Sequence, residues 1–161
     1  MDGTGGGELP LHPAGQRRLP KRLRLSEKLQ RKVHRLALLL AVLEKRVGLK
    51  MFQKDVFLNF AGGFRVADPG LDLAVVAAVI SSYYDRPIAD GVCCAGEIGL
   101  SGEVRPAPRT EQRVSEAARL GFRRIIVSGF LRKTLKVPKN IDVVYINNIG
   151  ELPPALFCEE F

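Results

Sequence analysis

One stretch, residues 96–113, constrains the fold more than any other part of the chain. It reads GEIGLSGEVRPAPRTEQR and places the turn dipeptide Ser101-Gly102 between two short segments. The pattern predicts a strand over residues 96–100, a returning strand over residues 103–105 and, after two prolines, a helix that begins near Thr110. The polar side chains of this stretch are therefore expected on a rigid frame.

Length and composition predict a single domain with a tail. The chain has 161 residues, of which 46% are hydrophobic and 26% charged, the profile of a soluble globular protein. Its longest apolar run, residues 36–43, is far shorter than the roughly 20 residues that a bilayer requires, so no membrane span is expected. We assign residues 1–25 to an arm and residues 26–161 to the domain.

The arm is rich in glycine, proline and basic residues and has no apolar periodicity, which predicts a disordered basic segment. An organelle transit peptide is an alternative, although the arm is neither Ser-rich nor clearly amphipathic. We also expect that the sequence begins inside a longer reading frame. The chain is then either a functional short form of a longer protein or a fragment of it.

Periodicity predicts alternating helices and strands within the domain. Helices are expected over residues 26–47, with Ser26 as N-cap, over residues 71–84, with Asp72 as N-cap, and over residues 110–120. The first has a seam from Leu29 to Val47, which Leu38, Leu39, Ala41 and Val42 widen into a helix buried nearly all round at its centre. A hairpin is expected over residues 55–67, further strands over residues 124–128 and 142–146, and a short helix after Gly150. This order predicts an α/β or α+β domain with a mixed sheet.

The net charge of +8 is divided into blocks. Residues 1–54 hold 13 Lys and Arg against 4 Asp and Glu, and residues 105–139 hold 10 against 2. Between them, residues 55–104 hold 2 against 7, and residues 140–161 hold none against 4. Basic blocks of this kind attract polyanions such as nucleic acid, and a solvated surface is the alternative interpretation.

The few cysteines and histidines predict no metal site. Cys93 and Cys94 are adjacent in a predicted strand, Cys158 is near the C-terminus, and both histidines lie apart from them. This makes neither a disulfide framework nor a zinc knuckle, and it fits a reducing compartment, either the cytoplasm or, in a eukaryote, a mitochondrion or plastid.

Common catalytic motifs do not occur in the sequence. There is no GxxxxGK[ST] loop for nucleotide phosphates, no GxSxG elbow and no HExxH pair. We therefore expect that the chain is not an enzyme by itself.

Four ordered motifs carry a specific resemblance. They are RLALLLAVLEKR at residues 35–46, DVFLNFAGG at 55–63, DPGLDLAV at 68–75, and GEIGLSGEVR at 96–105 followed by EQR and EAARLGF. Together they resemble the C-terminal domain of the RadA/Sms DNA-repair proteins, from about residue 35 to about residue 146.

The resemblance implies an α+β fold like that of the Lon proteolytic domain, which is similar to domain 2 of ribosomal protein S5. It also implies a ring-forming, ATP-driven motor that processes recombination intermediates on DNA. The family's zinc motif, RecA-like ATPase core and KNRFG motif are not in this chain, so ATP and zinc are expected only in the full-length family.

Active Lon domains use a Ser-Lys dyad, in which the lysine deprotonates the serine. The resemblance places Asp72 or Leu73 at the position of the nucleophile and Glu111 at the position of the lysine, so no catalytic residue is expected. Independently of that alignment, no lysine occurs between Lys54 and Lys133, and arginine cannot replace it as a base. A Lon-type serine peptidase is therefore the weaker alternative.

DNA is the expected partner, contacted through the phosphate backbone without sequence preference. Arg109 and Arg113 are four residues apart, so both can project from one helix start, and a guanidinium suits phosphate oxygens. Pairing with Glu103, Glu111 or Glu116 is the alternative for each single arginine. The candidate DNA-binding residues are Arg105, Arg109, Arg113, Arg119, Arg132 and Lys133.

A pure assembly module is a third interpretation, in which the chain forms a homo-oligomer. The seam of the helix over residues 26–47 offers one contact surface. The acidic residues 55–104 and the basic residues 105–139 offer another, since they could meet head to tail between subunits and close a ring.

Overall fold

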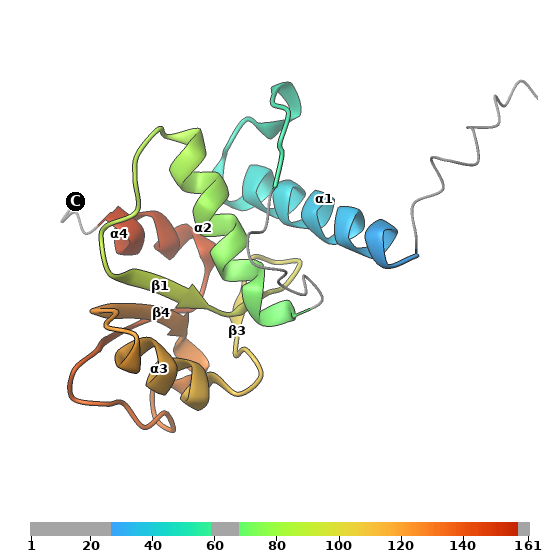
Figure 1. Ribbon diagram of the computed structural model, residues 1–161. Helices are drawn as coiled ribbons and strands as arrows, with labels where there is room; N and C mark the ends of the chain where they lie inside the picture. Colours follow the sequence, from blue (N-terminus) through green and yellow to red (C-terminus); the bar gives the residue numbers. More distant parts are fainter. Residues whose placement is uncertain (1–26, 59–67, 158–161) are drawn as a thin grey trace, which may run out of the picture.

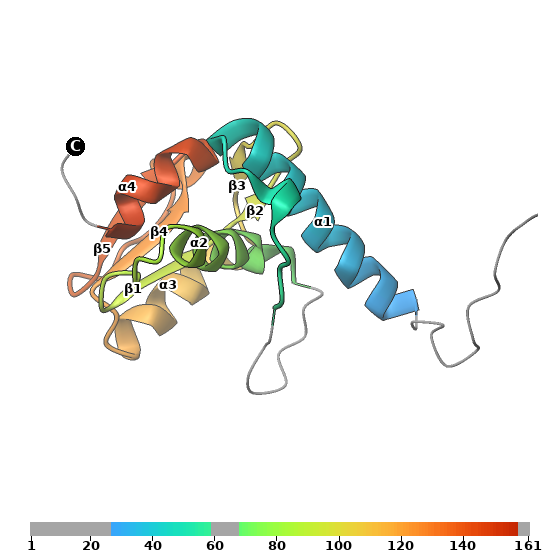
Figure 2. The same ribbon diagram turned by 90° about the horizontal axis from the view of Figure 1, so that it is seen from above.

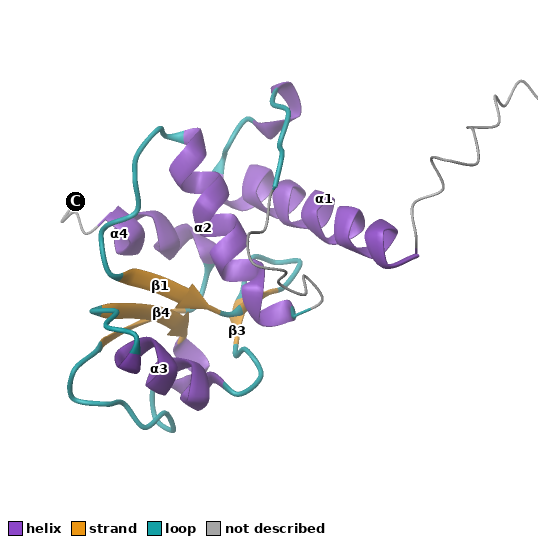
Figure 3. Ribbon diagram, viewed as in Figure 1, coloured by secondary structure: helices purple, strands orange, loops and turns teal. Residues whose placement is uncertain are grey.

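The computed structural model of the protein describes residues 27–58 and 68–157. Helices and strands both occur along these residues, as predicted, although no described strand lies between the first two α-helices (Figure 3). The helices are α1 (Glu27–Val47), α2 (Asp72–Tyr83), α3 (Thr110–Arg119) and α4 (Leu152–Phe157), with short 3-10 turns η2 (Met51–Gln53), η4 (Pro69–Leu71), η5 (Gly129–Leu131) and η6 (Ile149–Glu151). The strands are β1 (Val92–Ala95), β2 (Glu97–Ile98), β3 (Val104–Arg105), β4 (Arg124–Ser128) and β5 (Asp142–Ile146). No helix in these two ranges is long and apolar enough to span a membrane.

The strands form two separate sheets. The main sheet has the order β1-β4-β5 and is parallel throughout, with Val92 opposite Arg124 and Val127 opposite Tyr145. Strands β2 and β3 form an antiparallel pair, which confirms the hairpin predicted around Ser101-Gly102. The mixed α/β class is thus confirmed, but parallel and antiparallel pairing occur in different sheets.

Helices cover both faces of the main sheet. Figures 1 and 2 show α2, α4 and α1 over one face and α3 over the other. Successive residues of β4 point to opposite layers: Ile126 belongs to the core under α1, α2 and α4, and Ile125 and Val127 belong to the core under α3. A strand buried on both faces is apolar at every position rather than at alternate ones, as the sequence RIIVS is at its centre.

Helix α1 forms where periodicity predicts it, but its centre is buried on one side only and not nearly all round, since Ala41 is exposed. Leu39, Val42 and Leu43 are buried, whereas Leu36 and Leu40 remain half-buried. The reason is that α1 packs on the domain along one side only, while its start extends beyond the domain (Figure 2). The predicted N-cap, Ser26, lies outside the described residues.

The first predicted strand of the 55–67 hairpin is absent from its described part. Residues 55–58 have no strand assignment, and Phe57 is 92% exposed. An extended segment becomes a strand only when a partner satisfies its backbone groups, and none of the described strands pairs with this one. Residues 59–67, which were to complete the hairpin, lie outside the described residues.

Asp72 does not cap α2, which corrects its predicted structural role. The cap position belongs to Leu71, and Asp72 is the first helical residue. Its side chain is buried, and its Oδ1 accepts a hydrogen bond from Arg35 Nε at 3.0 Å while Oδ2 pairs with Arg35 Nη2. The same Oδ2 accepts the Ile98 amide at 3.1 Å, so this carboxylate joins α1, α2 and β2.

The hydrogen bond to Asp72, with the nearby charges of Asp72 and Glu97, raises the pKa of Arg35 despite its partial burial. Sequence analysis missed this arginine, although a signal exists. Arg35 stands four residues before Leu39 and eight before Leu43, so it shares their face of the helix. A charged residue on a buried face requires a partner.

We expect Asp72→Ala to lower the free energy of unfolding by about 2–3 kcal/mol, because it removes the main partner of the Arg35 guanidinium and leaves the Ile98 amide without its acceptor. Arg35 keeps 37% of its side chain exposed, which holds the loss below that of a fully buried pair. Urea unfolding of Asp72→Ala, Arg35→Ala and the double variant measures the coupling between the two residues. Strictly additive losses would contradict the role of the pair.

Candidate nucleic-acid interface

The hairpin of β2 and β3 closes the edge of the main sheet at which all three strands have their carboxyl ends. Ser128, the last residue of β4, donates its Oγ hydrogen to the Val104 carbonyl at 2.7 Å. The Val104 amide in turn donates to the carbonyl of Asn147, which directly follows β5, at 2.9 Å. Strand β3 is thus fixed across the ends of β4 and β5. Ligands of open α/β sheets bind at such carboxyl ends.

Five of the six predicted basic residues lie at this edge. Arg105 is in β3, and Arg109 and Arg113 lie at the start of α3, beside the residues that follow β1. Arg132 follows η5, and its guanidinium lies 5.2 Å from the ring centroid of Tyr145 near the end of β5. Lys133 is the next residue. We call the set Arg105, Arg109, Arg113, Arg132 and Lys133 the basic edge.

Arg119, the sixth predicted residue, lies at the opposite edge. Helix α3 runs back along the sheet, and Arg119 is its last residue. The side chain of Asn140, just before β5 begins, donates to the carbonyl of Ala118 at 3.2 Å, which fixes this end of α3 beside the amino ends of the strands. Spacing along the helix did not reveal this separation.

Asp68 holds one arginine of the basic edge in place. Arg113 pairs with the Asp68 carboxylate and donates its Nε hydrogen to the Pro108 carbonyl at 2.9 Å. Burial alone would raise the pKa of Asp68, but hydrogen bonds from Arg113 and Gly70 and the charges of Arg113 and Arg109 outweigh it and lower that pKa. Gly70 allows η4 to lie close to Ala107, which precedes α3, since a Cβ on Gly70 would lie 2.9 Å from the Cβ of Ala107.

Arg109 has an unusual backbone conformation. Its φ of 55° and ψ of 40° place it in the left-handed region, directly before the first turn of α3. Its carbonyl accepts the Arg113 amide at 3.1 Å. Such a conformation in a residue other than glycine costs on the order of 1 kcal/mol or more, and it is found often at functional sites. The side chain is exposed.

Ion pairs within the chain, the predicted alternative to DNA contact, occur at three of the six residues. Arg105 pairs with Glu103 and Arg119 with Glu116, both partners named from the sequence, whereas Asp68 as the partner of Arg113 was missed. Exposed pairs of this kind contribute about 0–1 kcal/mol, so a phosphate can replace the carboxylate. Arg109, Arg132 and Lys133 make no ion pair with a described carboxylate.

The two positions compared with the Lon dyad also lie at the carboxyl edge. Asp72 begins α2 on one face of the sheet, and Glu111 lies in the first turn of α3 on the other. The Asp72 carboxylate is fully engaged by Arg35 and the Ile98 amide. Glu111 is exposed. Among residues 34–58 and 68–157, no group of three or more potential ligands is placed to hold a metal ion.

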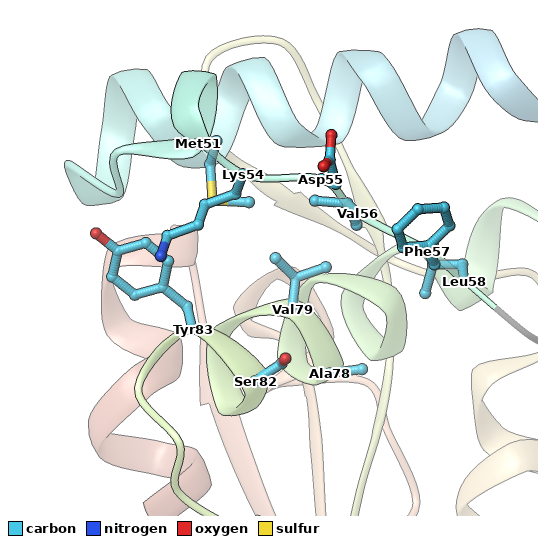
Figure 4. A pocket seen from close by; sticks show the side chains of 10 residues that line it. All are labelled: Met51, Lys54, Asp55, Val56, Phe57, Leu58, Ala78, Val79, Ser82 and Tyr83. Atoms are coloured by element: carbon cyan, nitrogen blue, oxygen red, sulfur yellow. The ribbon is translucent and has the colours of Figure 1, made fainter.

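A cavity of about 360 Å³ lies away from the basic edge. Figure 4 shows its two walls, one from α2 with Val79, Ser82 and Tyr83, and one from the segment that follows α1 with Met51 and Lys54. Sequence analysis did not predict this cavity. None of the predicted DNA-binding residues lines it.

Comparison with known proteins gives two kinds of match. A family model described as subunit ChlI of Mg-chelatase matches residues 28–129. DNA repair protein RadA from Listeria monocytogenes is 47% identical over 118 residues, and that from Bacillus subtilis is 46% identical over 118 residues; each match covers 73% of this chain and 26% of the relative. RadA from Streptococcus pneumoniae is 43% identical over 125 residues, 78% of this chain and 30% of the relative. The chain thus spans about a quarter to three tenths of these relatives.

These matches confirm the predicted similarity to RadA and correct one expectation. The absence of catalytic motifs led to the expectation that the chain is not an enzyme, and this was wrong. Both the model named for a chelatase subunit and the RadA matches indicate an enzyme family. Motif searches missed this because they test only for particular catalytic loops, and the match to the relatives extends over 118–125 residues.

The lowered pKa of Asp68 predicts a pH-dependent contribution to stability. Its carboxylate stabilises the fold above its unfolded pKa of about 3.9, and the contribution is lost as the pH falls through the lower folded pKa. We expect Asp68→Asn to reduce the free energy of unfolding by about 1 kcal/mol at pH 7 and by progressively less as the pH falls from about 5 to about 2.

Urea unfolding at a series of pH values measures this difference, and Asp55→Asn, which removes an exposed carboxylate that has no ion pair with a described residue, is the control. A difference between wild type and Asp68→Asn that stays constant over this range would contradict the role of the Asp68 carboxylate.

Proposed function

We propose a role in DNA repair for this chain, which belongs to the protein family described as subunit ChlI of Mg-chelatase. In this proposal it is the DNA-binding and ring-assembly part of a RadA-type, ATP-driven enzyme that acts in recombination. The names of the relatives support the repair role, and the basic edge supports contact with DNA. The chain's own part is to hold the phosphate backbone.

We further propose that the domain is the C-terminal, Lon-like domain of a longer protein, with the fold of the Lon proteolytic domain and of domain 2 of ribosomal protein S5. The α/β layers and the order of the four sequence motifs support this. The engaged carboxylate of Asp72 and the exposed carboxylate of Glu111 support a scaffold without peptidase activity, and incubation with casein tests for that activity directly.

The single observation that carries the proposal is the gathering of five cationic side chains at one edge. They come from three separate segments, β3, the start of α3 and the turn after β4, and the parallel sheet brings these segments together. Guanidinium groups bind phosphate oxygens through paired donors. Contacts of this kind position a protein on DNA without reading the base sequence.

Assembly into a ring is the second part of the proposal. Helix α1 extends beyond the domain (Figure 2), and its start carries Lys28, Arg31 and Lys32. A neighbouring subunit with acidic side chains, such as those of residues 84–103, would complement it. Head-to-tail contacts of this type close rings when the rotation between subunits allows it.

Loss of the basic edge should weaken DNA binding at low salt. We expect Arg109→Ala with Arg113→Ala to reduce the affinity for a duplex about tenfold at about 50 mM salt, and to make the dependence of log K on log salt shallower by about two units. Fluorescence anisotropy with a labelled oligonucleotide measures both quantities. Arg119→Ala is the control for loss of positive charge away from the site, since it removes one guanidinium at the opposite edge and should change the affinity less than twofold.

Arg109→Gly tests DNA binding without a loss of stability. Glycine adopts the left-handed conformation without strain, so this variant should be at least as stable as the wild type while it loses one phosphate contact. Unchanged affinity in both the double variant and Arg109→Gly would rule out the basic edge as the DNA site.

Self-association tests the assembly part. We expect light scattering to report a concentration-dependent oligomer that dissociates at high salt, because the proposed contact joins opposite charges. Charge reversal by Lys28→Glu with Arg31→Glu should shift the chain toward the monomer. A monomer at all concentrations, for the wild-type chain, would contradict assembly by this domain alone.

A further inference from the structure

We propose that Phe130 is a base-stacking residue that gives the basic edge a preference for single-stranded nucleic acid. This inference rests on the proposed function, because it assigns a substrate class to the same edge. It goes beyond phosphate contact, since stacking requires an unpaired base.

Phe130 is held in an exposed position by a well-anchored turn. It is the central residue of η5, directly after β4, and 70% of its surface is exposed. Its amide donates to Ser128 Oγ at 3.4 Å, and the same hydroxyl donates to the Val104 carbonyl. The backbone of the turn is therefore anchored to the buried end of β4.

Gly129, which precedes it, lies close to the end of β5. A Cβ on Gly129 would lie 2.1 Å from Oδ1 of Asn147, so a larger residue would require the exposed Asn147 side chain to move. The next turn continues with the Arg132 amide bound to the Gly129 carbonyl at 3.2 Å. An apolar ring is thus presented to solvent by a rigid element, which is the arrangement that stacking requires.

The surroundings of Phe130 are cationic. Arg132 and Lys133 follow it in the chain, and η5 contacts β3, the strand that carries Arg105. Arg132 lies over the face of Tyr145, which keeps its guanidinium at the surface of the sheet edge. Backbone-binding cations beside an exposed aromatic ring are the pair of features by which proteins bind single strands without sequence preference.

The two described aromatic residues that are more exposed than Phe130 do not share this setting. Phe52 and Phe57 are 72% and 92% exposed, but they lie on the segment after α1, which forms one wall of the cavity in Figure 4. Phe52 therefore provides a control of equal size and exposure away from the basic edge.

The test compares the affinity of the full chain for single-stranded DNA with its affinity for a duplex. We expect Phe130→Ala to weaken binding of a labelled oligothymidine about tenfold, while affinity for a duplex of equal length changes less than twofold and the salt dependence of both stays the same. Phe52→Ala should leave both affinities unchanged. Thermal unfolding of each variant shows whether the fold is retained.

A second variant reports stacking directly. The chain contains no tryptophan, so Phe130→Trp introduces a single fluorophore at the proposed contact. We expect oligothymidine to quench its emission and an abasic oligonucleotide of equal length to quench it much less.

Equal loss of single-strand and duplex affinity in Phe130→Ala, or equal quenching by thymidine and abasic strands, would overturn the inference and leave the phosphate-binding role intact. If the wild-type chain binds neither single-stranded nor duplex DNA, the proposed function and this inference both fail.

Discussion

The hairpin of β2 and β3 is the element on which the candidate site depends. One of its strands is held to α2, through the Ile98 amide and the Asp72 carboxylate, and the other is held across the ends of β4 and β5, through Val104. Because the three strands of the main sheet are parallel, their carboxyl ends meet at this one edge. The hairpin closes that edge and leads directly into α3, so its hydrogen bonds decide where the arginines lie.

Two carboxylates have opposite consequences for function. Asp72 is buried, and by engaging Arg35 it ties α1 to the domain, so it acts in the architecture. Asp68 is partly exposed and engages Arg113, so it competes with any phosphate that approaches the basic edge. A DNA backbone, with many phosphates at regular spacing, can displace a single carboxylate because several contacts form together. If DNA binds this edge as proposed, the site would bind a polyanion in preference to an isolated anion.

Sequence patterns predicted the elements well and the contacts between them less well. The helices over residues 27–47, 72–83 and 110–119 and the strands of the main sheet follow from local periodicity and turn residues. The pairs Arg35–Asp72 and Arg113–Asp68 join residues 37 and 45 positions apart, and no local pattern specifies such partners. The same limit explains Arg119, which was predicted as a site residue together with Arg109 and Arg113 but lies at the opposite edge. It also explains residues 55–58, whose alternation predicts a strand but which pair with none of the described strands.

The central claim is that DNA contacts the carboxyl edge of the parallel sheet. Titration of the isotope-labelled chain with a short oligonucleotide, followed by NMR through backbone amide and arginine side-chain signals, tests it most directly. The account predicts shifts in β3, the start of α3 and η5, with the signals of Arg119 and of the cavity around Tyr83 unchanged. Shifts centred on the far end of α3 or on that cavity, with the basic edge unaffected, would contradict it.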